Sequence, residues 1–252
     1  MYRRKLNVLL LGICIATWFV AIAARAEPPK NKAEELFRQM EQACVQAKSA
    51  NVAFSGKFQG AIDGELKGSL LLATGNKFRL EMKGDLAIGT DGIQPVNVAM
   101  VCDGKQSRTA SLDPQIPSQV VDVTNNYDTE MRLQLAHAGI LGPMFMLAEN
   151  VPPGQKPREF DAEKQLGVSD FQLGENQIIG ERQALTIHHK LHNRNYTEPL
   201  TVTVWLDATT KLPLKRKITL KQDNRAITLT ETYPTLTLDE KVDDQRFELP
   251  KP

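Results

Sequence analysis

Apolar residues recur with a helical period near the start of the chain. Asn31 stands where an N-cap is expected, and Glu34 follows three residues later, as in a capping box. The apolar positions that follow are spaced i, i+3, i+4, i+7, i+11 and i+14: Ala33, Leu36, Phe37, Met40, Cys44 and Ala47. This spacing predicts a helix of about four to five turns that packs one face against the rest of the protein.

From Asn51 onward the period changes to two, which is typical of strands. Asp63-Gly64 and Asp103-Gly104 are turn signals between alternating segments. The strands predicted here are 52–58, 65–72, 77–83 and 96–102. In 77–83 every second residue is charged, so this strand should have one dry face and one wet face. The segment therefore predicts an antiparallel meander.

The middle of the chain has a different pattern. Its residues predict a helix from Ser118 to about His137, which Gly139 and Gly142-Pro143 should break into pieces. The second piece, 144–148, is apolar on every side, so it must either be buried in the core or cover an apolar ligand. Methionine is frequent where a surface adapts to variable apolar partners, but simple core packing remains open.

Strand patterns return in the last third of the chain. The segments that alternate are 160–173 (weakly), 184–191, 201–206, 214–221 and 226–232. The order is then one helix, a set of strands, a helical insert at about 114–155 and a second set of strands. This order predicts an α+β fold in which an antiparallel sheet carries its helices on one face.

The first 26 residues have the pattern of a secretory signal peptide. A basic start, Arg3-Arg4-Lys5, precedes the apolar run 6–22, and Ala24-Arg25-Ala26 supplies a cleavage site. An uncleaved anchor is the alternative, because a largely apolar run of 17 residues is at the short limit for crossing a bilayer. We therefore expect a signal peptide over 1–26, a single domain over 27–252, and a periplasmic location.

The charge of the exported part excludes nucleic acid as its expected partner. Without the four basic residues of 1–26, the 31 Lys and Arg fall to 27 against 30 Asp and Glu, a formal charge of −3. A nucleic-acid-binding protein would be expected to carry a basic surface instead. Two cysteines remain in this part, Cys44 and Cys102, and two alternatives stay open for them: one disulfide bond or two buried thiols.

Residues suited to catalysis gather only in 188–192, where His188, His189 and His192 occur. On a strand, His188 and His192 lie roughly 13 Å apart and His189 points to the opposite face. These side chains should therefore be strand residues and not metal ligands. No glycine-flanked nucleophile, zinc-protease motif or phosphate loop is found in the sequence. We expect no catalytic site, no metal and no cofactor.

One charged residue occupies a position that the alternation assigns to the apolar side. In a regular strand Arg216 shares a face with Leu214, Ile218 and Leu220. The strand could bulge here, or the stem of Arg216 could pack while its head reaches water. Alternatively, Arg216 donates hydrogen bonds inside a cavity, to a lipid headgroup or to carbonyls of the lid. Trp205, on the preceding strand, is expected to pack across the strands.

With these elements in place, the chain resembles a known family, the periplasmic lipoprotein-carrier (LolA-like) superfamily. The resemblance follows the mature chain in outline and 178–250 in detail. Its motifs are Val204-Trp205-Leu206-Asp207, Leu212-Pro213-Leu214-Lys215-Arg216, Gln222-Asp223-Asn224 and Phe247-Glu248-Leu249-Pro250. The resemblance implies an incomplete, strongly curved β-barrel whose concave apolar face is covered by helices. Such folds hold acyl chains, and the family's carriers move lipoproteins from the inner to the outer membrane.

The resemblance implies a non-enzymatic carrier or sensor that binds a lipid or an acylated lipoprotein and exchanges it with an inner- or outer-membrane protein. The alternative is an envelope interaction or regulatory module of the same fold, with a packed core and no lipid. For the carrier, the lid contacts are expected from Leu133, Leu135, Ile140, Leu141, Met144, Phe145 and Leu147. The sheet contacts are expected from Phe78, Leu80, Met82 and Arg216.

Overall fold

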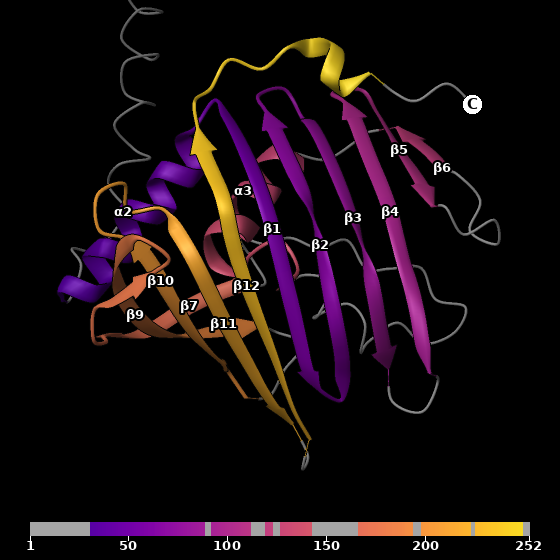
Figure 1. Ribbon diagram of the computed structural model, residues 1–252. Coiled ribbons are helices and arrows are strands. Elements are labelled where there is room, and N and C mark those ends of the chain that lie inside the picture. Colours follow the sequence, from indigo (N-terminus) through magenta and orange to yellow (C-terminus); the bar gives the residue numbers. More distant parts are fainter. Residues whose placement is uncertain are drawn as a thin grey trace, which may run out of the picture. The chain divides into compact units, whose positions relative to one another are not determined.

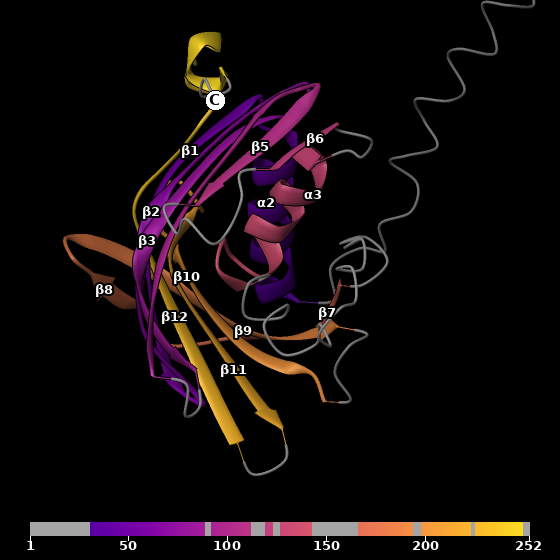
Figure 2. The same ribbon diagram turned by 90° about the vertical axis from the view of Figure 1, so that its right-hand side faces the viewer.

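A computed structural model describes residues 31–88, 92–111, 119–122, 127–142, 166–193, 198–222 and 225–248. They belong to one compact unit, Asn31–Pro252, in which two helices lie against one face of a curved sheet (Figures 1 and 2). We call this face the inner face and the opposite one the outer face. Among the described residues, no helix combines the length and the apolar character needed to cross a membrane.

A helix, a set of strands, a second helix and a second set of strands follow one another, as the sequence predicts. The helical elements are α2 (Lys32–Gln46), α3 (Tyr127–His137) and the short 3-10 helix η2 (Asp244–Phe247). The first set of strands is β1 (Ser49–Gly60), β2 (Ile62–Ala73), β3 (Lys77–Ile88), β4 (Ile93–Asp103), β5 (Gln106–Ser111) and β6 (Gln119–Asp122). The second set is β7 (Leu166–Leu173), β8 (Gln177–Ile179), β9 (Arg182–Asn193), β10 (Leu200–Asp207), β11 (Pro213–Gln222) and β12 (Arg225–Leu238).

The strands form one antiparallel sheet that is not closed. Its order is β6-β5-β4-β3-β2-β1-β12-β11-β10-β9-β7, and β8 pairs with β9 outside this path. The first and last strands meet in the middle of the sheet, where β1 pairs with β12 from Ala50↔Leu238 to Gly60↔Ile227. Within the described residues β6 and β7 are the two free ends of the sheet. The α+β class and the incomplete barrel are therefore confirmed.

Helix α2 forms as its sequence predicts. The side chain of Asn31 accepts a hydrogen bond from the backbone N–H of Glu34, at 3.0 Å, which satisfies one of the amides left free at a helix start. The predicted apolar stripe is the buried one: Ala33, Leu36, Phe37, Met40 and Cys44. Figure 2 shows this helix beside α3 on the inner face.

The helix predicted from Ser118 to His137 is wrong in its first part. Residues 119–122 form strand β6, which pairs with β5 through Ser107↔Val121 and Arg108↔Val120. Two consecutive β-branched valines favour this pairing over a helical turn. The helix begins at Tyr127 and ends at His137, so its end agrees with the prediction. Residues 144–148 lie outside the described residues.

Both helices and both sets of strands share one apolar core on the inner face. A second, small cluster lies apart from it and contains Ala184, Trp205 and Leu214. Leu214 was expected to share the face of Ile218 and Leu220, and this is wrong. The pairing of β10 with β11 shifts register between Trp205 and Leu206, which displaces Leu214 from the regular alternation.

Trp205 packs across strands as expected. Its indole N–H donates to Gln177 Oε1 at 3.0 Å, and Lys215 Nζ lies 4.9 Å from the ring centroid. Asp207 begins the following loop by accepting hydrogen bonds from the backbone N–H groups of Thr209 and Thr210. The hairpin is therefore held by turn and packing interactions.

A candidate lid on the apolar face of the sheet

The expected sheet contacts lie on the inner face, inside the main core. Phe78, Leu80 and Met82 alternate along β3 and are 2%, 8% and 6% exposed. Their register partners on β2 include Leu72, opposite Phe78, and Leu70, opposite Leu80. The charged residues between them face the other way, as the alternation predicts. Strands β2 and β3 thus contribute an apolar surface to the core that they share with the helices.

We use the word lid for the described residues 127–142, which comprise α3 and the turn after it. Of the expected lid contacts, Leu135 and Leu141 are buried, and Leu133 and Ile140 are half-buried against the main core. Met144, Phe145 and Leu147 lie outside the described residues. The lid therefore docks on the sheet through apolar side chains at its C-terminal end.

Arg216 is fully buried and binds the lid. Its Nη1 donates to the carbonyl of Leu135 at 2.9 Å, and its Nη2 donates to the carbonyl of Ala136 at 2.7 Å. The last carbonyls of a helix have no partner within the helix, so the guanidinium satisfies groups that would otherwise be left unpaired. The sequence left two functional partners open for Arg216, a lipid headgroup or carbonyls of the lid. The structure shows hydrogen bonds to the carbonyls of the lid.

The carboxylate of Glu231 holds the other side of the same turn. Glu231 lies directly opposite Arg216 in the pairing of β11 with β12 and is also fully buried. It accepts hydrogen bonds from the backbone N–H of Leu141 and from the hydroxyl of Tyr233. The Tyr233 hydroxyl also lies 3.5 Å from Arg216 Nη1. Together these residues form a buried polar latch: Arg216, Glu231 and Tyr233.

Burial dominates the ionisation of the latch. It raises the pKa of Glu231, and the hydrogen bond from Tyr233 and the charge of Arg216 act against this rise. Burial also raises the pKa of Tyr233 well above its usual value, and the neighbouring Glu231 raises it further. Tyr233 is therefore a neutral hydrogen-bond donor at neutral pH.

Sequence reasoning did not single out Glu231 and Tyr233, although β12 carries a signal for them. Ile227, Leu229, Glu231 and Tyr233 alternate with threonines, and all four are buried. A carboxylate at an inward position indicates a buried charged pair only when the residue opposite it on the next strand is known. For Glu231 that residue is Arg216. The register between β11 and β12 could not be read from the pattern alone.

Gly139 allows the lid to approach the latch closely. It stands two residues after the end of α3, and its φ is +76°, in the left-handed region that glycine adopts without strain. A Cβ placed on Gly139 would overlap Glu231 Oε2 and lie 2.7 Å from the hydroxyl oxygen of Tyr233. Gly56 on β1 plays a similar part, because a Cβ there would overlap the end of Leu141.

The lid also contacts α2 through polar side chains. His137 Nε2 and Glu41 Oε1 share a hydrogen bond, and Arg38 Nη1 donates to the other oxygen of Glu41 at 2.9 Å. Burial alone would raise the pKa of Glu41, but the hydrogen bonds and charges of His137 and Arg38 outweigh it and lower the pKa. The charged form of Glu41 is thus favoured at the contact between α2 and α3.

The three histidines of β9 do not meet. His188 and His192 lie on the outer face, where His188 Nδ1 is 2.9 Å from Thr203 Oγ1 and His192 Nε2 is 2.8 Å from Ser169 Oγ. His189 points inward, with ring centroids 4.8 Å from Phe37 and 5.7 Å from Phe171. In the part of the chain that the structure describes, no three metal-ligating side chains come together.

His189 is a buried base without a partner. Neither ring nitrogen has a hydrogen bond to a described residue, and the side chain is 2% exposed. Burial, helped by the charge of Arg216, lowers the pKa of His189 to about 3. The imidazole is therefore neutral at physiological pH and acts as an aromatic side chain of the core.

The two cysteines resolve the alternative that the sequence left open. Cys44 and Cys102 are both buried and both free, so the disulfide alternative is wrong and the two buried thiols are present. Burial raises the pKa of the Cys44 thiol to about 11 and also raises that of Cys102. Both thiols are thus kept in the unreactive protonated form.

Comparisons with known proteins give only structural likenesses. No protein-family model and no curated protein matches the chain. It is similar to LprF from Mycobacterium bovis, with 11% identity, a TM-score of 0.45, and 85% of this chain and 99% of that one covered. It is also similar to the Mycobacterium tuberculosis lipoprotein LppX, with 14% identity, a TM-score of 0.41, and 83% and 96% covered.

The resemblance that the sequence suggested recurs among these solved structures. One of them is a LolA superfamily protein from Nitrosomonas europaea, with 10% identity and a TM-score of 0.29 over 86% of this chain and 97% of that one. The chain is similar in outline to this LolA superfamily protein.

Proposed function

We propose that this chain is an exported, non-enzymatic carrier or sensor that binds the acyl chains of a lipid or lipoprotein between the inner face of the sheet and the lid. The observation that carries the proposal is the way in which the lid is held. A fully buried arginine and a fully buried glutamate bind backbone groups of the lid from two adjacent strands.

Such a latch is a poor device for stability alone. Removing a guanidinium and a carboxylate from water costs several kcal/mol per ion, and well-packed apolar residues at the same places are often as stabilising or more so. In some proteins buried ionic groups instead specify one arrangement or act in a switch between two. The latch supports a lid with a closed and an open arrangement over an apolar surface.

Under this proposal the apolar floor receives the ligand. Phe78, Leu80 and Met82 belong to the same core as Leu135 and Leu141 of the lid, so separating the lid from the sheet would expose apolar surface on both sides. An acyl chain can cover this surface, since burial of each methylene contributes about 0.8 kcal/mol. No catalytic group is required for this task. Release of residues 1–26 and a periplasmic location belong to the same proposal.

One observation favours a second candidate, an interaction or regulatory module with a packed core. Leu135, Ala136, Ala138 and Leu141 are at most 1% exposed, so side chains fill the contact between the end of α3 and the sheet. In this case the latch would fix a permanent structure, and binding would use another surface of the molecule.

The two candidates differ in what they retain and bind. The protein should be produced from residue 27, purified without detergent, and examined by native mass spectrometry before and after addition of a diacylated peptide. The same peptide without its acyl chains is the matched control. The carrier predicts a bound mass and a raised melting temperature only with the acylated peptide. A bare mass and an unchanged melting temperature in both cases would favour the packed module.

A further inference from the structure

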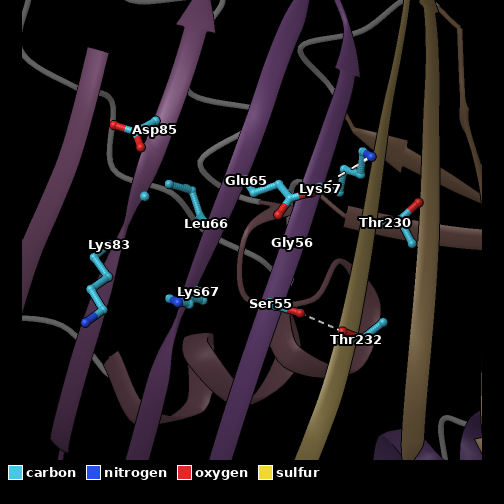
Figure 3. A pocket seen from close by; sticks show the side chains of 11 residues that line it. Ser55, Gly56, Lys57, Glu65, Leu66, Lys67, Lys83, Asp85, Thr230 and Thr232 are labelled. Atoms are coloured by element: carbon cyan, nitrogen blue, oxygen red, sulfur yellow. Dashed lines mark hydrogen bonds and ion pairs between the residues drawn. The ribbon is translucent and has the colours of Figure 1, made fainter. Parts of the chain in front are cut away.

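A hollow on the outer face has an unusual arrangement of charges. Its volume is about 380 Å³, and it lies over β12, β1, β2 and β3, on the side of the sheet away from the helices (Figure 3). The backbone of Gly56 and Gly84 and the small side chain of Ser55 line its centre. Charged side chains of both signs surround that centre.

The strand register sorts these charges into two rows. One row crosses the sheet as Thr232, Ser55, Lys67 and Lys83, and the next crosses it as Thr230, Lys57, Glu65 and Asp85. Figure 3 shows the rows side by side, with Asp85 and Glu65 on one side and Lys83 and Lys67 on the other. The rows are two residues apart along each strand, or roughly 7 Å.

Like charges therefore face each other across the pairing of β2 with β3. Lys67 is directly opposite Lys83, and Glu65 is directly opposite Asp85. Like charges at directly opposite positions destabilise a sheet, and exchanging the charges on one strand would have given two attractive pairs. The arrangement thus lowers stability while it places two lysines beside two carboxylates on β2 and β3.

Most of these charges are not used within the protein. Lys57 Nζ lies 3.9 Å from Glu65 Oε1, which is a weak, exposed ion pair. Among the described residues, the side chains of Lys67, Lys83 and Asp85 have no hydrogen-bond or ion-pair partner. The hydroxyls of Ser55 and Thr232, 2.7 Å apart, extend the lysine row with further polar groups. An anionic group would therefore find donors in one row, and a cationic group would find acceptors in the other.

We propose that this hollow binds a group in which a phosphate and a primary ammonium are joined by a short ethylene bridge, as in the ethanolamine phosphate headgroup of a lipid or the same group free in solution. The phosphate contacts Lys67 and Lys83, and the ammonium contacts Asp85 and Glu65. A phosphate alone would use only the first row. The hollow is on the outer face and does not depend on the lid.

The test uses the full mature chain and glycerophosphoethanolamine as the probe, with NMR of backbone amides as the readout. Saturable shifts are expected at the amides of Ser55, Lys67, Lys83 and Thr232. The double variant Lys67→Gln/Lys83→Gln and the double variant Glu65→Gln/Asp85→Asn should each raise the half-saturation concentration by about tenfold or more, which corresponds to about 1.4 kcal/mol of binding free energy.

Matched controls remove the same charges elsewhere on the surface. Lys221→Gln/Lys241→Gln and Glu175→Gln/Glu198→Gln should leave the binding unchanged. The lysine variant in the hollow should not lower the melting temperature, because it removes a repulsive pair. Binding of glycerophosphate without its amine as tightly as the complete probe would overturn the proposal. So would the absence of saturable shifts, or an equal loss of binding in the controls.

Vesicles identify the source of the headgroup. Co-sedimentation of the protein with vesicles of phosphatidylethanolamine and phosphatidylcholine, but not with phosphatidylcholine alone, assigns the site to a membrane lipid. Binding of the free probe without such co-sedimentation assigns it to a small molecule. In both cases the lysine variant of the hollow should lose the interaction, and retention of the interaction by that variant would contradict the proposed site.

Discussion

Arg216 and Glu231 are charged residues at positions that the alternation of their strands directs into the core. Each is fully buried, and each binds backbone groups of the lid instead of water. The charge of one compensates that of the other across the strands, since they are register partners. This pair and the nearby neutral His189 should each affect the free energy of unfolding.

Replacing Arg216 with Met should lower the free energy of unfolding by about 3 to 5 kcal/mol, because the carboxylate of Glu231 is left buried without a compensating charge. The double variant Arg216→Met/Glu231→Gln should recover part of this loss, as no charge then remains. Urea unfolding followed by circular dichroism measures both. The control is Lys217→Met, because Lys217 is an exposed neighbour on the same strand. An equal loss of unfolding free energy in Arg216→Met and Lys217→Met would contradict the role of the latch.

His189 should make the protein less stable in mild acid. Its pKa is about 3 in the folded protein and about 6.5 in the unfolded chain, so only the unfolded state binds the proton between these values. Stability from this residue is therefore lost as pH falls below about 6.5, by about 2 kcal/mol between pH 7 and pH 5.

The variant His189→Phe keeps an aromatic ring against Phe37 and Phe171 and removes the titration. The raised pKa of Glu231 acts in the opposite direction, since the folded state then binds its proton more readily, but this effect is common to both proteins. The unfolding free energies of the unmodified protein and of His189→Phe, measured from pH 7 to pH 5, should therefore diverge. Parallel curves for the two proteins would show that His189 is not the source of the acid sensitivity.

At the scale of elements, the periodicity of the sequence predicts most of what forms. The stripe of α2 and the alternation along β3 are found as expected because each depends on local spacing. The prediction fails at 119–122, where pairing with β5 overrides a helix signal, and at Leu214, where a register shift displaces a side chain. The latch could not be predicted, because it depends on which residues face each other across β11 and β12.

The contact between the lid turn and the latch should be sensitive to a single methyl group. Gly139→Ala places a Cβ against Glu231 and Tyr233 in addition to its strained backbone, and should destabilise the protein by more than about 1 kcal/mol. Hydrogen exchange of the amides in 131–142 should accelerate. Gly180→Ala is the matched control, because Gly180 has a similar φ of +62° and no atom within 4 Å of its Cβ position.

The two glycine variants separate strain from contact. If the closed lid depends on the approach of Gly139 to the latch, exchange in 131–142 rises in Gly139→Ala and stays at the level of the unmodified protein in Gly180→Ala. The same exchange in both variants would mean that the lid turn does not need the close approach that the structure shows.

At the scale of the whole molecule, an open antiparallel sheet brings two surfaces of different character together in one protein. Its inner face is apolar and carries the lid, while its outer face carries rows of charged and hydroxyl side chains. The alternation of inward and outward residues along each strand produces both surfaces from the same segments. We propose that an acyl chain lies at the inner face, between the sheet and the lid.

Photo-crosslinking can locate such an acyl chain in the protein. A diacylated peptide with a diazirine in its acyl chain is added to the detergent-free mature protein and irradiated, and the modified residues are located by mass spectrometry. We predict modification of the β3 segment 78–82 and of the lid segment 131–141, with strong competition by the same peptide without the diazirine. Crosslinks confined to outward residues such as Lys67 and Lys83, or unaffected by the competitor, would contradict the proposal that the inner face holds the acyl chain.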